Sequence, residues 1–381
     1  MPRIVLTLFL LQVAHLHMGC AALPSSSDPG RPTGVEPLLS GPLPDPHVFH
    51  DGDQYYIFGT GTHFYHGAAL EPEAMVRDEL ELDFREEGGP YQIWAFKPYV
   101  HSDGSHHAYV TIHYGFFVTA VAHFVPQDGE TWEPGHPVRR WRLNRVLVGD
   151  RSGEGPMAYD PKALRDDHGR LYLFYAYSKQ RHSDVQLYAQ AMIDPGTPDT
   201  AAAPRLVLAP EGYRSEDRNP GFIQLVEAAN IVRWDDTYLL LYSVGDFALR
   251  EGEPSNYKIG LAYSDQLIPP SGQTYRKILL PDPENLWDND SRDDEVGYLL
   301  QSQHATWPNY CRDWVQGPGV GNIVRLDDGP WLVFHGYRPD AEHAGADQRY
   351  VWKAPLDIAI DRDRPPQDWV RVRLPEASPS P

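Results

Sequence analysis

Three acidic side chains in this 381-residue chain precede aromatic, strand-forming segments and could do chemistry together. Asp45 lies in LPDPHVF and Asp160 lies in AYDPKAL, so the same Asp-Pro phrase occurs twice. Glu227 lies in the apolar segment LVEAANI, in a similar place before the next such segment. A carboxylate inside an apolar strand costs free energy unless it is paired or used. Carboxyl groups that meet in one site can donate and accept protons, so these residues predict acid–base chemistry.

The local sequence around the two aspartates predicts how they enter their strands. Proline after Asp45 and Asp160 predicts an extended backbone at each Asp and removes one donor from the strand ladder, as at the start of a strand. A single Asp-Pro commonly does no more than form a turn. Two copies in register with a repeat, together with Glu227 in a third equivalent place, favour a shared site instead.

The elements that must position these carboxylates recur five times. In each copy, a turn with Asp or Gly is followed by a short aromatic and aliphatic strand, which is typical of a β-hairpin. The copies are residues 51–61, 103–115, 166–178, 234–245 and 326–337. Their anchoring aromatics are Tyr56, Tyr109, Tyr172, Tyr238 and Trp331. The spacing predicts an all-β fold, a five-bladed β-propeller of four-stranded antiparallel blades around a central channel. A β-sandwich is the alternative, but it would not need the same hairpin five times.

Composition agrees with this fold and narrows the partners. The chain has 22 Tyr, 13 Phe and 10 Trp, which favour strands, and 32 Gly and 36 Pro, which favour many turns. Its formal net charge of −20 argues against nucleic acid and anionic membrane surfaces as partners. No phosphate-binding glycine loop and no His-Glu-x-x-His motif occurs. We expect a monomer.

The N-terminus has the pattern of an export signal. Arg3 precedes an apolar run at residues 4–14 that is too short to span a bilayer, and small residues follow at 19–22. Gly19-Cys20 also resembles a lipoprotein cleavage site, so secretion and a lipid anchor at Cys20 both stay open. We therefore predict a signal peptide at 1–22, a linker at 23–40, a catalytic propeller at 41–360 and a tail at 361–381. The only other cysteine is Cys311, which excludes an internal disulfide in the mature chain and predicts a buried thiol.

Taken together, the segments resemble glycoside hydrolase family 43, which contains arabinanases, arabinofuranosidases and β-xylosidases. The resemblance covers roughly residues 42–360, including the YSVGDF segment at 242–247 and YKIGLAYS at 257–264. It implies that Asp45 is the general base, that Asp160 orients the acid and tunes its protonation, and that Glu227 is the general acid. It further implies inverting hydrolysis of arabinose- or xylose-containing plant polysaccharides or oligosaccharides, in which the base activates a water molecule.

Two segments depart from the family pattern. The family often has a His before the fifth hairpin that helps to hold calcium, but residues 317–322 here contain none. The sequence therefore requires no cofactor and leaves a Ca²⁺ site doubtful. Where the family has Trp-Ala-Pro, this chain has Trp94-Ala-Phe-Lys97, and Lys97 is unexpected.

Several other residues are candidates for contact with sugar. Trp94, Phe116 and Trp307 could stack on a sugar ring, and His335 and Arg338 could reach the channel mouth. Two competing functions stay open. One is a retaining propeller enzyme such as a fructan hydrolase, which would use different motifs. The other is an exported carbohydrate-binding propeller without catalysis, which the departures at residues 94–97 and 317–322 favour and the three carboxylates oppose.

Overall fold

The computed structural model describes residues 35–374 with gaps. The gaps are residues 85–90, 116–117, 134, 150–154, 181–182, 212–216, 220–222, 250–254, 279, 282–294, 297, 303–309, 342–344 and 365–368. The predicted signal peptide therefore lies outside the described residues, as do Cys20, Phe116 and Trp307.

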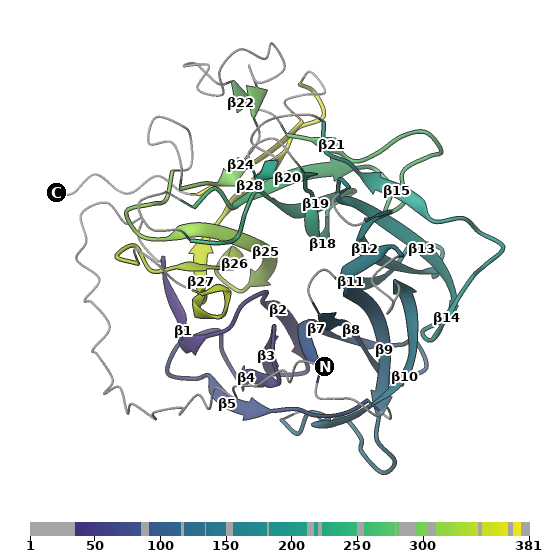
Figure 1. Ribbon diagram of the computed structural model, residues 1–381. Helices are drawn as coiled ribbons and strands as arrows, with labels where there is room; N and C mark the ends of the chain where they lie inside the picture. The colour runs from purple at the N-terminus through teal and green to yellow at the C-terminus, as the bar shows by residue number, and fades with distance from the viewer. Residues whose placement is uncertain are drawn as a thin grey trace, which may run out of the picture.

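Five β-sheets form the blades of a propeller around a central axis, as the sequence predicted (Figure 1). The first blade has β2 (His47–Asp51), β3 (Gln54–Phe58), β4 (His63–Gly67) and β5 (Val76–Glu79). The second has β7 (Gln92–Val100), β8 (His106–Gly115), β9 (Val118–Pro126) and β10 (Arg140–Gly149), with β6 (Glu81–Asp83) parallel to β10. The third has β11 (Met157–Arg165), β12 (Leu171–Ser178), β13 (Gln186–Asp194), β14 (Thr197–Pro198) and β15 (Arg205–Leu208).

The last two blades and the remaining strands complete the fold. The fourth blade has β18 (Glu227–Trp234), β19 (Thr237–Val244), β20 (Lys258–Ser264), β21 (Arg276–Lys277) and β24 (Tyr298–Leu300). The fifth has β25 (Gln316–Leu326), β26 (Gly329–Tyr337), β27 (Tyr350–Pro355) and β1 (Glu36–Pro42). Short pairs are formed by β16 (Asp217–Asn219) with β17 (Ile223–Gln224), β22 (Leu280–Pro281) with β23 (Glu295–Val296), and β28 (Asp357–Ile360) with β29 (Val370–Arg373). A 3₁₀ turn spans Ala346–Gln348.

Each predicted hairpin joins the two innermost strands of one blade. The pairs are β2–β3, β7–β8, β11–β12, β18–β19 and β25–β26, all antiparallel. Five buried apolar clusters lie between the blades, one at each contact between neighbouring sheets. Because each cluster is shared by two blades, apolar burial holds the blades around the axis as well as stabilising each sheet.

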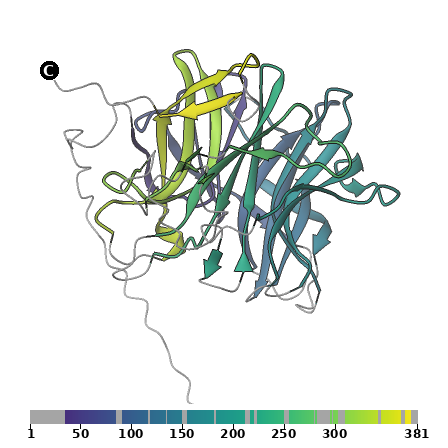
Figure 2. The same ribbon diagram turned by 90° about the horizontal axis from the view of Figure 1, so that it is seen from above.

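The ring is closed by the N-terminal strand, which corrects the predicted linker. β1 pairs with β27 in the fifth blade, with Glu36 opposite Lys353. The fold therefore begins inside the segment 23–40, because its Leu38 and Leu39 are buried in the cluster between the fifth and first blades. The predicted tail also contributes a strand, β29, whose hairpin with β28 lies beside the fifth blade (Figure 2).

Every innermost strand carries, in or just before it, one non-glycine residue with positive φ. These residues are Asp45, Ala95, Asp160, Ala228 and Val320, with φ between 51° and 57°. In four blades the strand ladder is interrupted at this residue, which is the mark of a β-bulge. The prediction of an extended backbone at Asp45 and Asp160 is therefore wrong. The proline removes a ladder donor as expected, but the bulge turns the Asp backbone into the left-handed region.

The bulges are held by the neighbouring blades. The N–H of Asp45 donates to Nδ1 of His335 at 2.7 Å, and the N–H of Asp160 donates to Oγ1 of Thr111 at 2.9 Å. The N–H of Val320 likewise donates to Oγ of Ser243 at 2.9 Å. In each case the acceptor side chain comes from the preceding blade. The packing of the blades therefore holds each residue with positive φ in its strained conformation.

Two further predictions concern Cys311 and membranes. Cys311 is fully buried and its thiol lies 3.2 Å from the carbonyl oxygen of Gln301, which confirms the predicted buried thiol. Among the residues described, no helix has the length and apolar character needed to cross a bilayer.

Candidate active site

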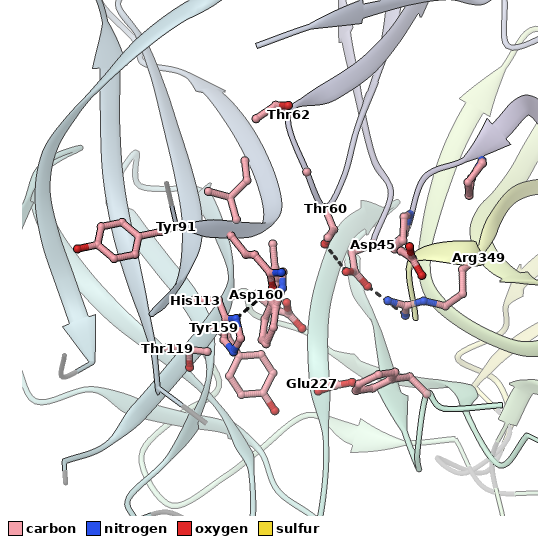
Figure 3. A pocket seen from close by; sticks show the side chains of 18 of the residues that line it. Asp45, Thr60, Thr62, Tyr91, His113, Thr119, Tyr159, Asp160, Glu227 and Arg349 are labelled. Atoms are coloured by element: carbon pink, nitrogen blue, oxygen red, sulfur yellow. Dashed lines mark hydrogen bonds and ion pairs between the residues drawn. The ribbon is translucent and has the colours of Figure 1, made fainter. Parts of the chain in front are cut away.

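A cavity of about 870 Å³ is lined by residues from all five blades. Asp45, Asp160 and Glu227 all line it, and Figure 3 shows the three carboxyl groups around one opening. These side chains are separated by 115 and 67 residues along the chain, so only the circular arrangement of the blades gathers them. The convergence that the sequence predicted is therefore present in the fold.

The bulges explain why these positions line the cavity. The bulge residue itself lines it in two blades, as Asp45 and Asp160. The residue just before the bulge lines it in four blades, as Pro44, Trp94, Tyr159 and Glu227. Glu227 is thus one residue earlier than the register of the two aspartates, which corrects the predicted equivalence. The side chain of Glu227, which is longer than that of an aspartate, therefore starts from a different backbone position than the side chains of Asp45 and Asp160.

The carboxylate of Asp45 accepts a hydrogen bond at one oxygen and forms an ion pair at the other. Oγ1 of Thr60 donates to Oδ2 at 2.5 Å, and Nη1 of Arg349 lies 3.3 Å from Oδ1 (Figure 3). Nδ1 of His335 lies 3.5 Å from Oδ1, but this contact is not an ion pair. That nitrogen accepts the Asp45 N–H, and burial together with Arg349 holds the pKa of His335 well below its usual value. The cation that forms an ion pair with Asp45 is therefore Arg349 and not His335.

Glu227 is 8% exposed and is bonded to a buried tyrosine. The hydroxyl of Tyr257 donates to Oε1 at 2.6 Å. Tyr257 packs closely on Gly319, since a Cβ at that glycine would lie 1.9 Å from the tyrosine Cε1. The glycine-rich segment 317–322 is therefore needed for the approach of the ring that positions Glu227.

The pKa of Asp160 depends on its burial and on four charged neighbours. Burial is the main cause that raises its pKa well above the ordinary value, and the neighbouring Glu227 and Asp45 raise it further. Lys97 and Arg349 act in the opposite direction. The protonation of Asp160 therefore depends on the charges of Glu227 and Asp45 as well as on its burial.

An aromatic wall lies beside the carboxylates. Trp94 lines the cavity and stacks on His113, with ring centroids 4.3 Å apart, and Tyr91 lines the same side. An indole exposed to a cavity offers a flat apolar surface that suits the C–H face of a sugar. Phe116 and Trp307 lie outside the described residues, so the structure does not place them.

Two predicted contacts with substrate do not reach the cavity. His335 is fully buried behind Asp45, where it holds the backbone of that residue. Arg338 stacks on Tyr350, with its guanidinium carbon 4.4 Å from the ring centroid, and does not line the cavity. The sequence placed His335 in the fifth hairpin and Arg338 just after it, as the structure has them, but the packing of β26 and β27 turns both side chains away from the cavity.

Sequence reasoning missed three residues that contact the carboxylates. Arg349, Tyr257 and Thr60 each bond one of them, and all three line the cavity. Arg349 is buried. In the sequence it is a single arginine just before an apolar strand, and that pattern does not indicate a functional residue. Tyr257 lies inside a segment that carried the family resemblance, so its place was indicated but not its role.

Polar side chains on the five innermost strands form a second set, the channel ring, some of whose members contact or act on one another. These residues stand two positions after the bulges and are His47, Lys97, Lys162, Asn230 and Asn322. Nζ of Lys162 lies 3.3 Å from Nδ1 of His47, and the first and third blades that carry them are not neighbours. Their contact therefore crosses the centre of the propeller.

This ring does not fit a divalent cation. Its two ionisable amines would repel a metal ion, and Nζ of Lys97 is buried without a hydrogen-bond partner in the described structure. Within the described residues, no three His, Cys, Asp or Glu side chains are grouped so as to hold a metal ion. We therefore assign no step of the chemistry to calcium.

The comparisons agree with the fold. The sequence matches no protein-family profile and no curated protein. Among solved structures, a thermostable family-43 glycoside hydrolase is similar with a TM-score of 0.58 and 18% identity, over 89% of this chain and 95% of its own. An exo-1,5-α-L-arabinanase from a bovine ruminal metagenomic library gives 0.58 and 18%, over 88% and 97%.

A third structure was solved with a bound oligosaccharide. The Cellvibrio cellulosa α-L-arabinanase complexed with arabinohexaose gives a TM-score of 0.56 and 18% identity, over 87% of this chain and 95% of its own. The chain therefore has the fold of the family that its motifs resemble.

Proposed function

We propose that the protein is a glycoside hydrolase. The observation that carries this proposal is the convergence of Asp45, Asp160 and Glu227 in one cavity beside an indole. Hydrolysis of a glycoside needs one carboxyl group that protonates the leaving oxygen and a second that acts at the anomeric side. A cavity with one buried acid bonded to tyrosine and another carboxylate paired with arginine offers two such groups in different environments.

More particularly, we propose a member of glycoside hydrolase family 43 that acts on arabinose- or xylose-containing plant oligosaccharides or polysaccharides with inversion. Asp45 is the base, because the charge of Arg349 and the hydrogen bond from Thr60 both stabilise its ionised form. Glu227 is the acid, because burial and the neighbouring Asp160 both favour its protonated form. Asp160 tunes that acid, and Trp94 supports the sugar ring. The sequence motifs and the shared fold support this assignment.

A simple charge count favours one protonated carboxyl group among the three. Three carboxyl groups interact here with two cations, Lys97 and Arg349. Two ionised carboxylates balance those cations, so the third retains its proton. A site with two carboxylates and one carboxylic acid is what inverting hydrolysis with a separate tuning residue requires.

The test is a panel of aryl α-L-arabinofuranosides, aryl β-D-xylosides, arabinan and xylan, with products identified by chromatography. We expect release of arabinose or xylose products by the wild-type protein, and its loss in Asp45→Asn. Proton NMR of the first product formed should show the inverted anomer. Retention would support a different propeller hydrolase, and binding without turnover would support the non-catalytic carbohydrate-binding alternative.

We also propose export, on the pattern of residues 1–22. A plant polysaccharide cannot enter a cell intact, so export suits this substrate. Mass spectrometry of the mature protein from culture fluid and membranes would distinguish a secreted chain from one lipidated at Cys20.

A further inference from the structure

Lys97, which departs from the family pattern, is a charged residue in a buried position. It lies on β7, two residues after the bulge at Ala95, and it is 2% exposed. Its Nζ has no hydrogen-bond partner among the described side chains and backbone. Burial of an ammonium group without a hydrogen-bond partner is strongly unfavourable unless other charges compensate it.

The ionisable groups that act on Lys97 or are affected by it fall into two sets. Asp160 and Asp45, which line the cavity, attract it. Lys162 and His47 face it within the channel ring. His47 is neutral, because burial and the two lysines hold its pKa well below the usual value. The compensation for Lys97 therefore comes from the two aspartates of the site.

The second channel lysine differs from Lys97 in its partners. Nζ of Lys162 donates towards Nδ1 of His47, and neither Asp45 nor Asp160 acts on it. Burial and the neighbouring Lys97 lower the pKa of Lys162 to about 7. Burial also lowers the pKa of Lys97, but the charges of Asp160 and Asp45 oppose that shift, whereas no carboxylate does so for Lys162. The two aspartates therefore favour a charge on Lys97 rather than on Lys162.

We propose that Lys97 is the resident cation of the axial channel, a positioning residue whose charge favours the ionised forms of Asp45 and Asp160 in place of a bound metal ion. This inference rests on the proposed function, because it gives the two carboxylates their working charge. Lys97 is not among the residues that line the cavity. Its effect on the site passes through Asp45 and Asp160.

The first test is the pH profile of Lys97→Met, which keeps the length of the side chain and removes its charge. Only Arg349 then opposes the carboxylates, so the cluster takes up a further proton at higher pH. We expect the acidic limb of kcat/KM to move towards neutral pH by about one unit, as expected for loss of a nearby opposite charge. KM measured at high pH should change little.

Lys162→Met is the matched control, and its acidic limb should stay in place. An unchanged limb in Lys97→Met, or equal shifts in both variants, would overturn the proposal.

The second test does not use activity. Carbon-13 NMR of aspartate carboxyl groups, assigned with Asp160→Asn, should show the Asp160 resonance titrating at higher pH in Lys97→Met than in wild type or Lys162→Met. Chelation and re-addition of Ca²⁺ should leave the wild-type melting temperature unchanged, and stabilisation by Ca²⁺ would contradict a resident ammonium. If the wild type cleaves no glycoside, the proposed function fails, while the NMR titration still decides the role of Lys97.

Discussion

The hydroxyl of Tyr257 donates a 2.6 Å hydrogen bond to Oε1 of Glu227, and this contact fixes the orientation of the proposed acid. The tyrosine is itself buried, and burial is the main cause that raises its pKa well above the usual value, so it stays a donor. A general acid must aim its proton at the leaving oxygen, and a buried phenol restricts the rotation of the glutamate. Tyr257 is thus a positioning residue for the proposed reaction.

Tyr257→Phe should lower kcat about tenfold to a hundredfold, the range for a hydrogen bond to a charged or ionisable partner. KM should change less, because the hydroxyl acts on Glu227. Steady-state kinetics on an oligosaccharide measure the split, and circular dichroism checks the fold. A loss confined to KM would mean that Tyr257 binds substrate instead.

Glu227→Gln should reduce hydrolysis of natural oligosaccharides by about a hundredfold to ten-thousandfold, the usual contribution of a general acid. An aryl glycoside with a very acidic leaving group needs little protonation, so its hydrolysis should fall much less. Asp45→Asn, the comparison variant, should impair both substrates alike, since every substrate needs the activated water. Equal losses in Glu227→Gln would count against the acid role.

Gly319→Ala should destabilise the protein by about 1–3 kcal/mol, the usual cost of overpacking, and lower its activity. The added Cβ would lie 1.9 Å from Cε1 of Tyr257 and 2.7 Å from Nε2 of His335, so both rings must move. Gly115→Ala is the matched control, because its added Cβ would meet no atom within 4 Å. Denaturant unfolding measures the difference, and similar midpoints for the two variants would refute the packing argument.

A chain of hydrogen bonds across β8, β9 and β10 of the second blade should make stability depend on pH. Nδ1 of His107 lies 3.0 Å from Nε2 of His123, whose Nδ1 lies 3.0 Å from Nδ2 of Asn144. Burial is the main cause that lowers the pKa of His107 to about 4 and that of His123 to about 3. Since both folded values lie below the ordinary 6.5, the stabilisation is complete above that pH.

Stability should therefore decline as the pH falls from about 6.5 towards 4, where the unfolded chain binds protons that the folded chain does not. The denaturation midpoint measured across this range should fall less steeply in His123→Gln than in wild type. The exposed turn residue His168, changed to Gln, should leave the slope unaltered. A wild-type midpoint that is level over the range would disprove the prediction.

Lys353→Ala should weaken the closure of the ring. Its Nζ donates to the carbonyl of Leu70 at 3.0 Å and to Glu71 at 2.7 Å, and it lies 3.2 Å from Glu36 of β1. The carboxylates are about half exposed and can be hydrated, so the main loss is the buried carbonyl partner, worth about 1–3 kcal/mol. Asp128→Ala, which breaks an exposed pair with Arg142, should change stability by less than about 0.5 kcal/mol. Thermal unfolding compares the two variants.

The repeat could be predicted from the sequence because it is local. Turn residues followed by alternating aromatic side chains occur within a dozen residues, and five such hairpins indicate five blades. Asp45, Asp160 and Glu227 were found in the same way, since each stands just before a hairpin. The strand β1 was missed because Glu36–Pro42 has no hairpin of its own and is stabilised by a partner more than 300 residues away.

By itself, then, the sequence determined the number of blades and the carboxylates that could meet, because both depend on short segments that repeat along the chain. Tertiary structure decided what surrounds each carboxylate. Arg349 reaches Asp45, Tyr257 reaches Glu227 and Lys97 acts on Asp160 only because the blades close into a circle. Electrostatic and hydrogen-bond energies depend on distance in space and on burial, and neither quantity is encoded in the spacing of residues along the chain.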